Sequence, residues 1–398
     1  MARKTRWRPA LLGAAVALSA GIASAGVGDL AYMKSPPMSF QGTILRSLKA
    51  IPPEQRVAAG LVSPKAVLLK STGAIRIAVD AGAADAETLD LVRIDTTGTG
   101  NFRDARALKL KIQTRSTSYT RGSFGPETVQ IPRNGKTIPV RVFGHYYGRA
   151  QRVYGGASLT VAAEGSCAFA RTQRKVRVVD GSGNLALGDP AKPPFSRSTA
   201  RPKADMVFVA DENGNFTGPR STPTYLGQPI EVGGAWYVVS AEDMKVSAAP
   251  LEGGTGEVSV DAARWQCTLA GEKYLLTVRG GKEPVRVPPD RYRIQQYRLY
   301  AEEATDRRVA MIYGYRGTKA LDVAAAKATR LPIGSPIQAK ILTRQASGRV
   351  IFSLAQTDGA GARIGGVIAE GGKRPPKPKI DVVGKEGKVV YTANLEYG

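Results

Sequence analysis

Apolar and polar residues alternate along most of the chain after residue 70. Ile75, Ile77 and Val79, for example, stand at every second position. Successive side chains of a β-strand point to opposite faces of a sheet, so this alternation predicts strands with one buried and one solvated face. Helices are expected only over residues 40–50 and 322–328. The pattern predicts an all-β protein of two or three antiparallel β-sandwich or open-barrel modules.

Two local signals sharpen this picture. Asn134-Gly135 separates two alternating runs, and Asn-Gly supplies the positive φ angles that a two-residue hairpin turn needs. Between Tyr292 and Tyr300 the apolar positions change parity, which indicates a β-bulge near Gln295–Gln296. We therefore expect a tight hairpin at the first site and one extra residue in a strand at the second.

Composition shifts suggest where the chain divides. Prolines crowd residues 188–204, which reads as a linker or as a long loop inside one domain. The expected organisation is a signal peptide (1–25), an N-terminal segment with little regular structure (26–70), two β-rich domains (71–190 and 205–316) and an immunoglobulin-like β-sandwich (317–398).

The first 25 residues have the layout of a secretory signal peptide. Four cations precede the apolar run Ala10–Ile22, and Ala23-Ser24-Ala25 offers small residues for cleavage. No later run is long and apolar enough to predict a membrane span after cleavage. We expect a secreted or periplasmic protein.

Few residues are available for metal or thiol chemistry. With one histidine and two cysteines, the chain excludes zinc sites built on several such ligands and a disulfide-dense scaffold. In an oxidising compartment Cys167 and Cys267 are candidates for a disulfide, the alternative being two buried, unpaired thiols. His145 has no nucleophile elbow near it in sequence, which favours a packing or surface role.

Three strands end in an aspartate followed by a Gly/Asn-rich turn, at Asp95, Asp180 and Asp211. Oxygen ligands at alternate positions are typical of calcium loops, but the later positions of these three depart from that pattern. The other interpretation, which we favour, is that each carboxylate bonds the backbone of its own turn. Calcium is the only cofactor that the sequence suggests.

Basic residues dominate: 57 Lys and Arg against 33 Asp and Glu give a formal net charge of +24. Cations crowd residues 171–177, among them Arg174, and they alternate with tyrosines farther on. Such a surface suits an anionic polysaccharide or an envelope protein better than nucleic acid in an exported protein, the alternative being a generally cationic, solvated surface. The predicted binding surface comprises Arg291, Tyr292, Arg293, Tyr297, Arg298 and Tyr300.

Two stretches near the end carry a family resemblance. Val287-Pro288-Pro289-Asp290-Arg291-Tyr292 resembles a step of carboxypeptidase-regulatory-like and transthyretin-like β-sandwich modules. Residues 378–398 are similar to the last hairpin of immunoglobulin-like modules in uncharacterised secreted bacterial proteins. The resemblance implies an exported all-β protein and transfers no catalytic residue.

The sequence thus favours an exported, non-enzymatic β-rich protein of the cell envelope or extracellular space. Its predicted role is a binding or structural module for an anionic polymer or a protein partner. One alternative is a secreted hydrolase of polysaccharide or peptide whose carboxylates come from distant strands; another is a set of calcium-stabilised structural modules.

Overall fold

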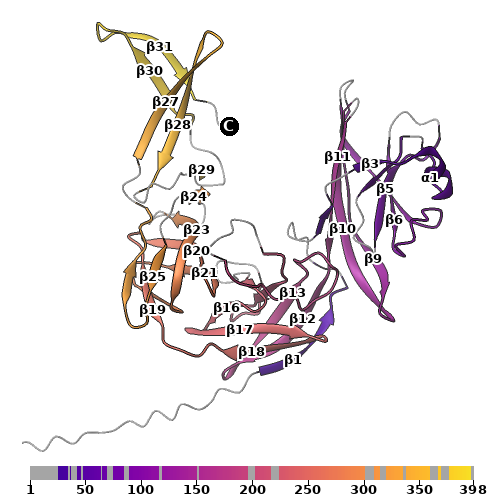
Figure 1. The fold of residues 1–398 in the computed structure, drawn as a ribbon, viewed down its shortest axis with the longest axis horizontal. Helices are drawn as coiled ribbons and strands as arrows, with labels where there is room; N and C mark the ends of the chain where they lie inside the picture. Colours follow the sequence, from indigo (N-terminus) through magenta and orange to yellow (C-terminus); the bar gives the residue numbers. More distant parts are fainter. Residues whose placement is uncertain are drawn as a thin grey trace, which may run out of the picture.

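The chain folds almost entirely into β-strands, which confirms the predicted all-β class (Figure 1). One sheet is nearly closed and barrel-like, and another forms a half-barrel. The computed structural model describes residues 26–34, 36, 43–45, 48–63, 65–69, 75–84, 89–115, 119–149, 152–195, 202–216, 224–300, 309–313, 320–334, 338–358, 366–368 and 376–395. The predicted signal peptide lies outside these residues.

Two five-stranded sheets form what we call the insert module. One sheet has the order β2 (Thr43–Leu45), β11 (Arg152–Thr160), β10 (Lys136–Arg149), β9 (Tyr119–Arg133) and β8 (Lys111–Arg115). The other has the order β3 (Leu48–Ala50), β4 (Val67–Leu69), β5 (Arg76–Asp80), β6 (Leu91–Asp95) and β7 (Arg106–Lys109). Apolar side chains of both sheets share one core, in which Ile77, Ile94, Ile131 and Leu159 are almost fully buried.

The hairpin predicted at Asn134-Gly135 is confirmed. It joins β9 to β10, with Lys136 directly opposite Arg133. Asn134 (φ 48°) and Gly135 (φ 72°) both adopt the left-handed conformation that this turn requires.

Eight strands form the central sheet. Their order is β15 (Thr224–Tyr225), β14 (Met206–Val209), β13 (Thr172–Val179), β12 (Ala162–Phe169), β1 (Gly26–Tyr32), β18 (Lys245–Pro250), β17 (Ala235–Glu242) and β16 (Pro229–Val232). Phe169 of β12 meets Tyr237 of β17 edge to face, with ring centroids 5.1 Å apart. Strands separated in the sheet therefore share one core.

The first described strand, β1, lies in the middle of this sheet. Gly26–Asp29 pairs with β18 and Leu30–Tyr32 pairs with β12. A Cβ atom at Gly28 would lie 1.7 Å from the carbonyl oxygen of Ser166, so only glycine fits where the strands cross. The whole insert module is thus inserted between two neighbouring strands of the central sheet.

The third module follows β18. It contains a three-stranded sheet with the order β22 (Val285–Val287), β19 (Gly256–Ser259) and β26 (Ala328–Arg330). Its larger sheet runs β21 (Leu275–Gly280), β20 (Arg264–Ala270), β23 (Asp290–Tyr300), β24 (Val309–Tyr313) and β29 (Gly366–Ile368), with β25 (Leu321–Val323) also paired to β23. Trp265 and Tyr292 are the largest fully buried side chains in the core between them.

The predicted bulge is confirmed in β23. Thr268 lies opposite Gln296 and Leu269 lies opposite Ile294, so Gln295 is the extra residue. The bulge restores the parity of the strand, because apolar side chains before and after it point into the same core.

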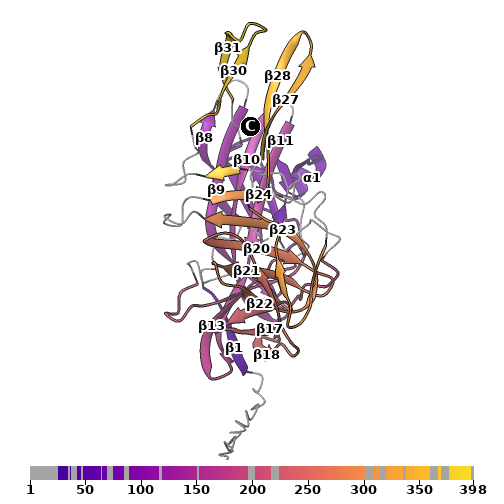
Figure 2. The ribbon, with the colours of Figure 1, turned by 90° about the vertical axis from the view of Figure 1, so that its left-hand side faces the viewer.

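Two hairpins make up most of the described chain from Gln338 onward. β27 (Gln338–Ala346) pairs with β28 (Arg349–Thr357), and β30 (Lys379–Val383) pairs with β31 (Val389–Asn394). Each is a separate two-stranded sheet, and both project beyond the third module in Figures 1 and 2. We expected an immunoglobulin-like sandwich over residues 317–398. The described residues of this range are instead divided between these two hairpins and the third module.

Three other expectations differ from the structure. The described parts of 40–50 are strands, and within 322–328 a turn at 324–327 joins β25 to β26, because pairing with neighbouring strands overrides the local preference for helix. Residues 26–70 supply four strands and the short helix α1 (Pro53–Ala58). The Pro-rich segment joins modules: Phe195 is buried beside Leu275, and its N–H donates to the carbonyl of Gly271. Strands β13 and β14, on either side of residues 188–204, pair directly within the central sheet, which matches the interpretation of this segment as a long loop inside one domain.

Candidate ligand-binding pocket

A pocket of about 360 Å³ lies where the central sheet meets the third module. The central sheet contributes Arg174 of β13 and Trp236 of β17, and the third module contributes Thr277 and Arg279 of β21 together with Val285. Arg174 and Arg279, about a hundred residues apart in sequence, therefore line one cavity.

Two hydrogen bonds, one of them buried, join the two modules beside the pocket. The indole N–H of Trp236 donates to the carbonyl of Arg286 across 3.1 Å. The side-chain oxygen of buried Gln228 accepts the N–H of Leu275 at 2.9 Å. Both bonds cross from the central sheet to the third module, so the pocket is formed before any ligand arrives.

Arg174 reaches the pocket from β13 with a side chain that is only 13% exposed. Its Nε is buried and has no hydrogen-bond partner among the described residues. Its terminal nitrogen Nη2 lies 3.7 Å from a carboxylate oxygen of Glu212, whose side chain is 71% exposed. Because an unsatisfied buried donor costs about 1–3 kcal/mol, this guanidinium gains stability when it donates to a further acceptor group.

Arg279 enters the pocket from the other wall and belongs to a row of polar residues on the outer face of the third module. Gln266 lies directly opposite Arg279 on one side and opposite Arg298 on the other. The Nε of Arg279 donates to the side-chain oxygen of Gln266 at 3.3 Å. Burial, and then the nearby Arg298, lowers the pKa of Arg279, while Tyr300 opposes them. The two guanidinium groups of this arginine row (Arg279, Gln266, Arg298) repel each other, and an anion placed beside them relieves that repulsion.

Carboxylates also line the pocket, and two of them are engaged by their own turns. Glu231 accepts the N–H of Gly234 at 2.6 Å, and Asp211 accepts the N–H groups that follow it. Glu212 stands beside Arg174. The cavity therefore offers both cations and hydrogen-bond acceptors, with the indole of Trp236 as an apolar wall.

The predicted Arg/Tyr surface is divided between the two faces of β23. Arg291, Arg293 and Arg298 are exposed and Tyr300 is half-buried, but Tyr292 and Tyr297 lie in the core. The reason is the pleat: tyrosines adjacent to outward arginines must point inward. The hydroxyl of Tyr292 donates to the carbonyl of Pro288, and that of Tyr297 donates to Asp358. The tyrosine contribution to that surface is thus reduced to Tyr300, over whose ring the Arg264 guanidinium lies, 4.6 Å from the centroid.

The three strand-ending aspartates bond their own turns. Each carboxylate accepts hydrogen bonds from backbone N–H groups that follow it in sequence, which is the turn arrangement. The donors are Thr97, Gly98 and Gly100 for Asp95, Gly183 and Leu185 for Asp180, and Asn213 and Asn215 for Asp211. Among the described residues no group of three or more His, Cys, Asp or Glu side chains is placed to hold a metal ion.

Another aspartate, the buried Asp205, carries no turn signal in the sequence. Its carboxylate accepts the N–H groups of Gly181, Ser182, Gly188 and Asp189 and so closes the loop that begins at Asp180. Burial raises its pKa to about 6, against the lowering effect of these donors. Only the fold brings it to this loop.

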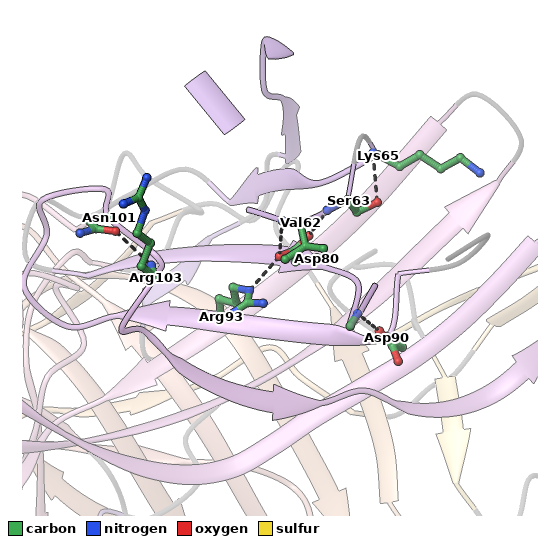
Figure 3. Close-up of polar contacts among 9 residues, drawn as sticks. Val62, Ser63, Lys65, Asp80, Asp90, Arg93, Asn101 and Arg103 are labelled. Carbon is green, nitrogen blue, oxygen red and sulfur yellow. Dashed lines mark hydrogen bonds and ion pairs between the residues drawn. The ribbon is translucent and has the colours of Figure 1, made fainter. Parts of the chain in front are cut away.

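The pKa of Asp80, in the insert module, is shifted in the direction opposite to that of Asp205; Figure 3 shows its contacts. Its fully buried carboxylate accepts the N–H groups of Val62 and Ser63 and the Nε of Arg93, at 2.8–3.1 Å. Burial alone would raise its pKa, but these donors together bring it below the usual value. The ion pair joins β6 to β5, and the two N–H bonds hold Val62 and Ser63 against β5.

The remaining candidates, Cys167, Cys267 and His145, do not line the pocket. Cys167 is buried in the core of the central sheet and Cys267 in that of the third module, and both are free thiols. Cys167 and Cys267 therefore do not form a disulfide, because their side chains lie in two different cores. Burial raises the pKa of both thiols. His145 is exposed on β10.

Within the described chain no helix has the length and apolarity needed to cross a membrane. Comparison with protein-family models, curated proteins and solved structures finds no match to this chain.

Proposed function

We propose that this protein is an exported, non-enzymatic protein that binds an acidic polysaccharide in the pocket between the central sheet and the third module. The observation that carries the proposal is the approach of Arg174 and Arg279 to one cavity from two modules. A guanidinium binds a carboxylate through charge-assisted hydrogen bonds, and two of them fix its orientation.

The other pocket groups match the rest of a sugar acid. Its hydroxyls can donate to Glu212 and Glu231, and its apolar ring face can pack against Trp236. A simple inorganic anion would use the arginines but not these acceptors. The arginine row continues the cationic surface beyond the cavity, which suits a polymer with repeated negative charges.

Calorimetric titration with a panel of acidic trisaccharides, built of galacturonate, mannuronate or glucuronate, tests this proposal. We expect at least one to bind, with an affinity that falls as salt rises, and a neutral glucose trisaccharide not to bind. Equal binding of neutral and acidic sugars, or no binding of any acidic member at low salt, would overturn it.

The second candidate is a secreted hydrolase, because Glu212 and Glu231 come to the pocket from different segments, and glycosidases use two carboxylates beside the scissile bond. Release of reducing ends from the same panel, lost in Glu212→Gln, would favour this function over binding alone.

A further inference from the structure

The two C-terminal hairpins carry most of the exposed apolar side chains. Of the twelve large apolar residues that are exposed in the described chain, eight lie on these hairpins. They are Ile341, Leu342, Val350, Ile351, Val383, Val389, Val390 and Tyr391. Such a concentration marks an interaction surface, since soluble proteins otherwise scatter these residues singly.

The β27–β28 hairpin is also incomplete as a sheet. Among the described strands, β27 and β28 pair only with each other, over nine residues each. A two-stranded sheet is at best marginally stable in water, and its free edges offer unpaired N–H and C=O groups to a further strand. The hairpin therefore has room for a third strand at an edge.

The register separates its two faces by chemistry. Ile341 lies opposite Leu354 and Gln345 opposite Val350, which places these residues and Phe352 on one face. The other face carries the cations Lys340, Arg344 and Arg349 together with Leu342 and Ile351, and residues 338–357 contain no acidic residue. One face thus carries no charge, and the other carries three cations and no anion.

The charge of these faces indicates which kind of strand can pair with the edge of the hairpin. A second copy would bring three cations against three cations in a chain whose formal net charge is already +24, so self-association is opposed. A strand that alternates apolar and acidic residues matches both faces at once, because its apolar side chains extend the Ile341 face and its carboxylates lie beside the cations.

We propose that the β27–β28 hairpin is a docking site for an extended, acidic segment of another protein, which adds to its edge as a third strand. This site is distant in sequence from the polysaccharide pocket and does not depend on it.

An array of eight-residue peptides that alternate apolar and acidic positions tests the proposal with the full-length protein. Matched arrays carry basic residues in place of acidic ones, or the same acidic residues grouped in a block. We expect the alternating acidic peptides to bind best and to protect the backbone amides of 338–357 from hydrogen exchange. Ile341→Ser should weaken binding at least about tenfold, whereas Val57→Ser, which changes a comparably exposed residue on α1, should not.

Four outcomes would overturn the proposal. They are no binding by any alternating acidic peptide, equal binding by the blocked peptides, a dimer that forms with concentration and protects the hairpin, and Ile341-dependent binding to anionic phospholipid vesicles. Because Ile341 is 54% exposed, its replacement leaves the folded cores intact, and unchanged exchange in β20 and β23 verifies this.

Discussion

Asp180 and Asp205 are fully buried carboxylates that hold the same loop from its two sides. Asp180 starts the loop and accepts the N–H groups of Gly183 and Leu185, while Asp205 closes it. Leu185, at the centre of the loop, packs in the core of the insert module. The pair therefore fastens the insert module to the central sheet.

Removal of Asp205 should destabilise this junction strongly. Asp205→Ala leaves four backbone N–H groups without their acceptor, and we expect the free energy of unfolding to fall by about 3 kcal/mol or more. Asp211→Ala is the matched control: it removes two such bonds from an exposed turn and should cost about 1 kcal/mol. Urea denaturation of both variants measures the difference, and equal losses would contradict the role assigned to Asp205.

The same carboxyl group predicts an unusual pH dependence. Burial raises the pKa of Asp205 to about 6, above its value of 3.8 in the unfolded chain. The part of the stability that is linked to its protonation is therefore complete below pH 4 and is lost as pH rises through 6, by on the order of 3 kcal/mol.

Denaturation between pH 4 and pH 7 should show this as a difference between the native chain and Asp205→Asn, with the native chain losing more stability as pH rises. Asp80, whose pKa lies below its usual value, acts in the other direction and only as pH falls below about 4. Parallel stability curves for the two proteins from pH 4 to 7 would rule out the predicted titration.

Calcium should have no effect on thermal stability. The carboxylate oxygens of Asp95, Asp180 and Asp211 already accept hydrogen bonds from their own turns, so binding an ion would first break those bonds. We expect the melting temperature to be the same with millimolar calcium and with a chelator. A rise of several degrees with calcium would instead support calcium-stabilised modules.

Two neighbours on β23 should respond in opposite ways to truncation. Tyr297 is buried and its hydroxyl bonds Asp358, so Tyr297→Ala should cost about 3–5 kcal/mol of stability. Arg298 is exposed in the arginine row, so Arg298→Ala should leave stability within about 0.5 kcal/mol and weaken binding of an acidic trisaccharide. Similar melting temperatures for both variants would contradict the inward placement of Tyr297.

Local features of the fold could be predicted from sequence because local chemistry determines them. The Asn134-Gly135 turn and the bulge at Gln295 each depend on a few adjacent residues. The placement of β1 could not be predicted, since Leu30 pairs with Gly165 across 135 residues and leaves no local pattern. Residues 322–328 show the converse: their alanines favour helix locally, but pairing of the flanking residues with β23 and β19 makes strands.

Only some residues of the candidate site could be predicted from the sequence. Arg174 and Arg298 stand in cationic runs that the sequence singles out, whereas Arg279 and Trp236 have no such signal. Their meeting depends on how the central sheet docks against the third module, through bonds such as that from Leu275 to Gln228. Alternation shows which side chains point outward but not which outward faces meet.

The most direct measurement of the central claim is the affinity of the best-bound acidic trisaccharide for Arg174→Gln and Arg279→Gln. Each variant removes one guanidinium from the pocket, and each should raise Kd about 10- to 100-fold, the equivalent of about 1.5–3 kcal/mol. Arg330→Gln makes the same change in net charge at an arginine that is 71% exposed and does not line the pocket, and should leave Kd nearly unchanged. Equal affinities for all three variants would contradict the claim that the pocket binds the sugar's carboxylate.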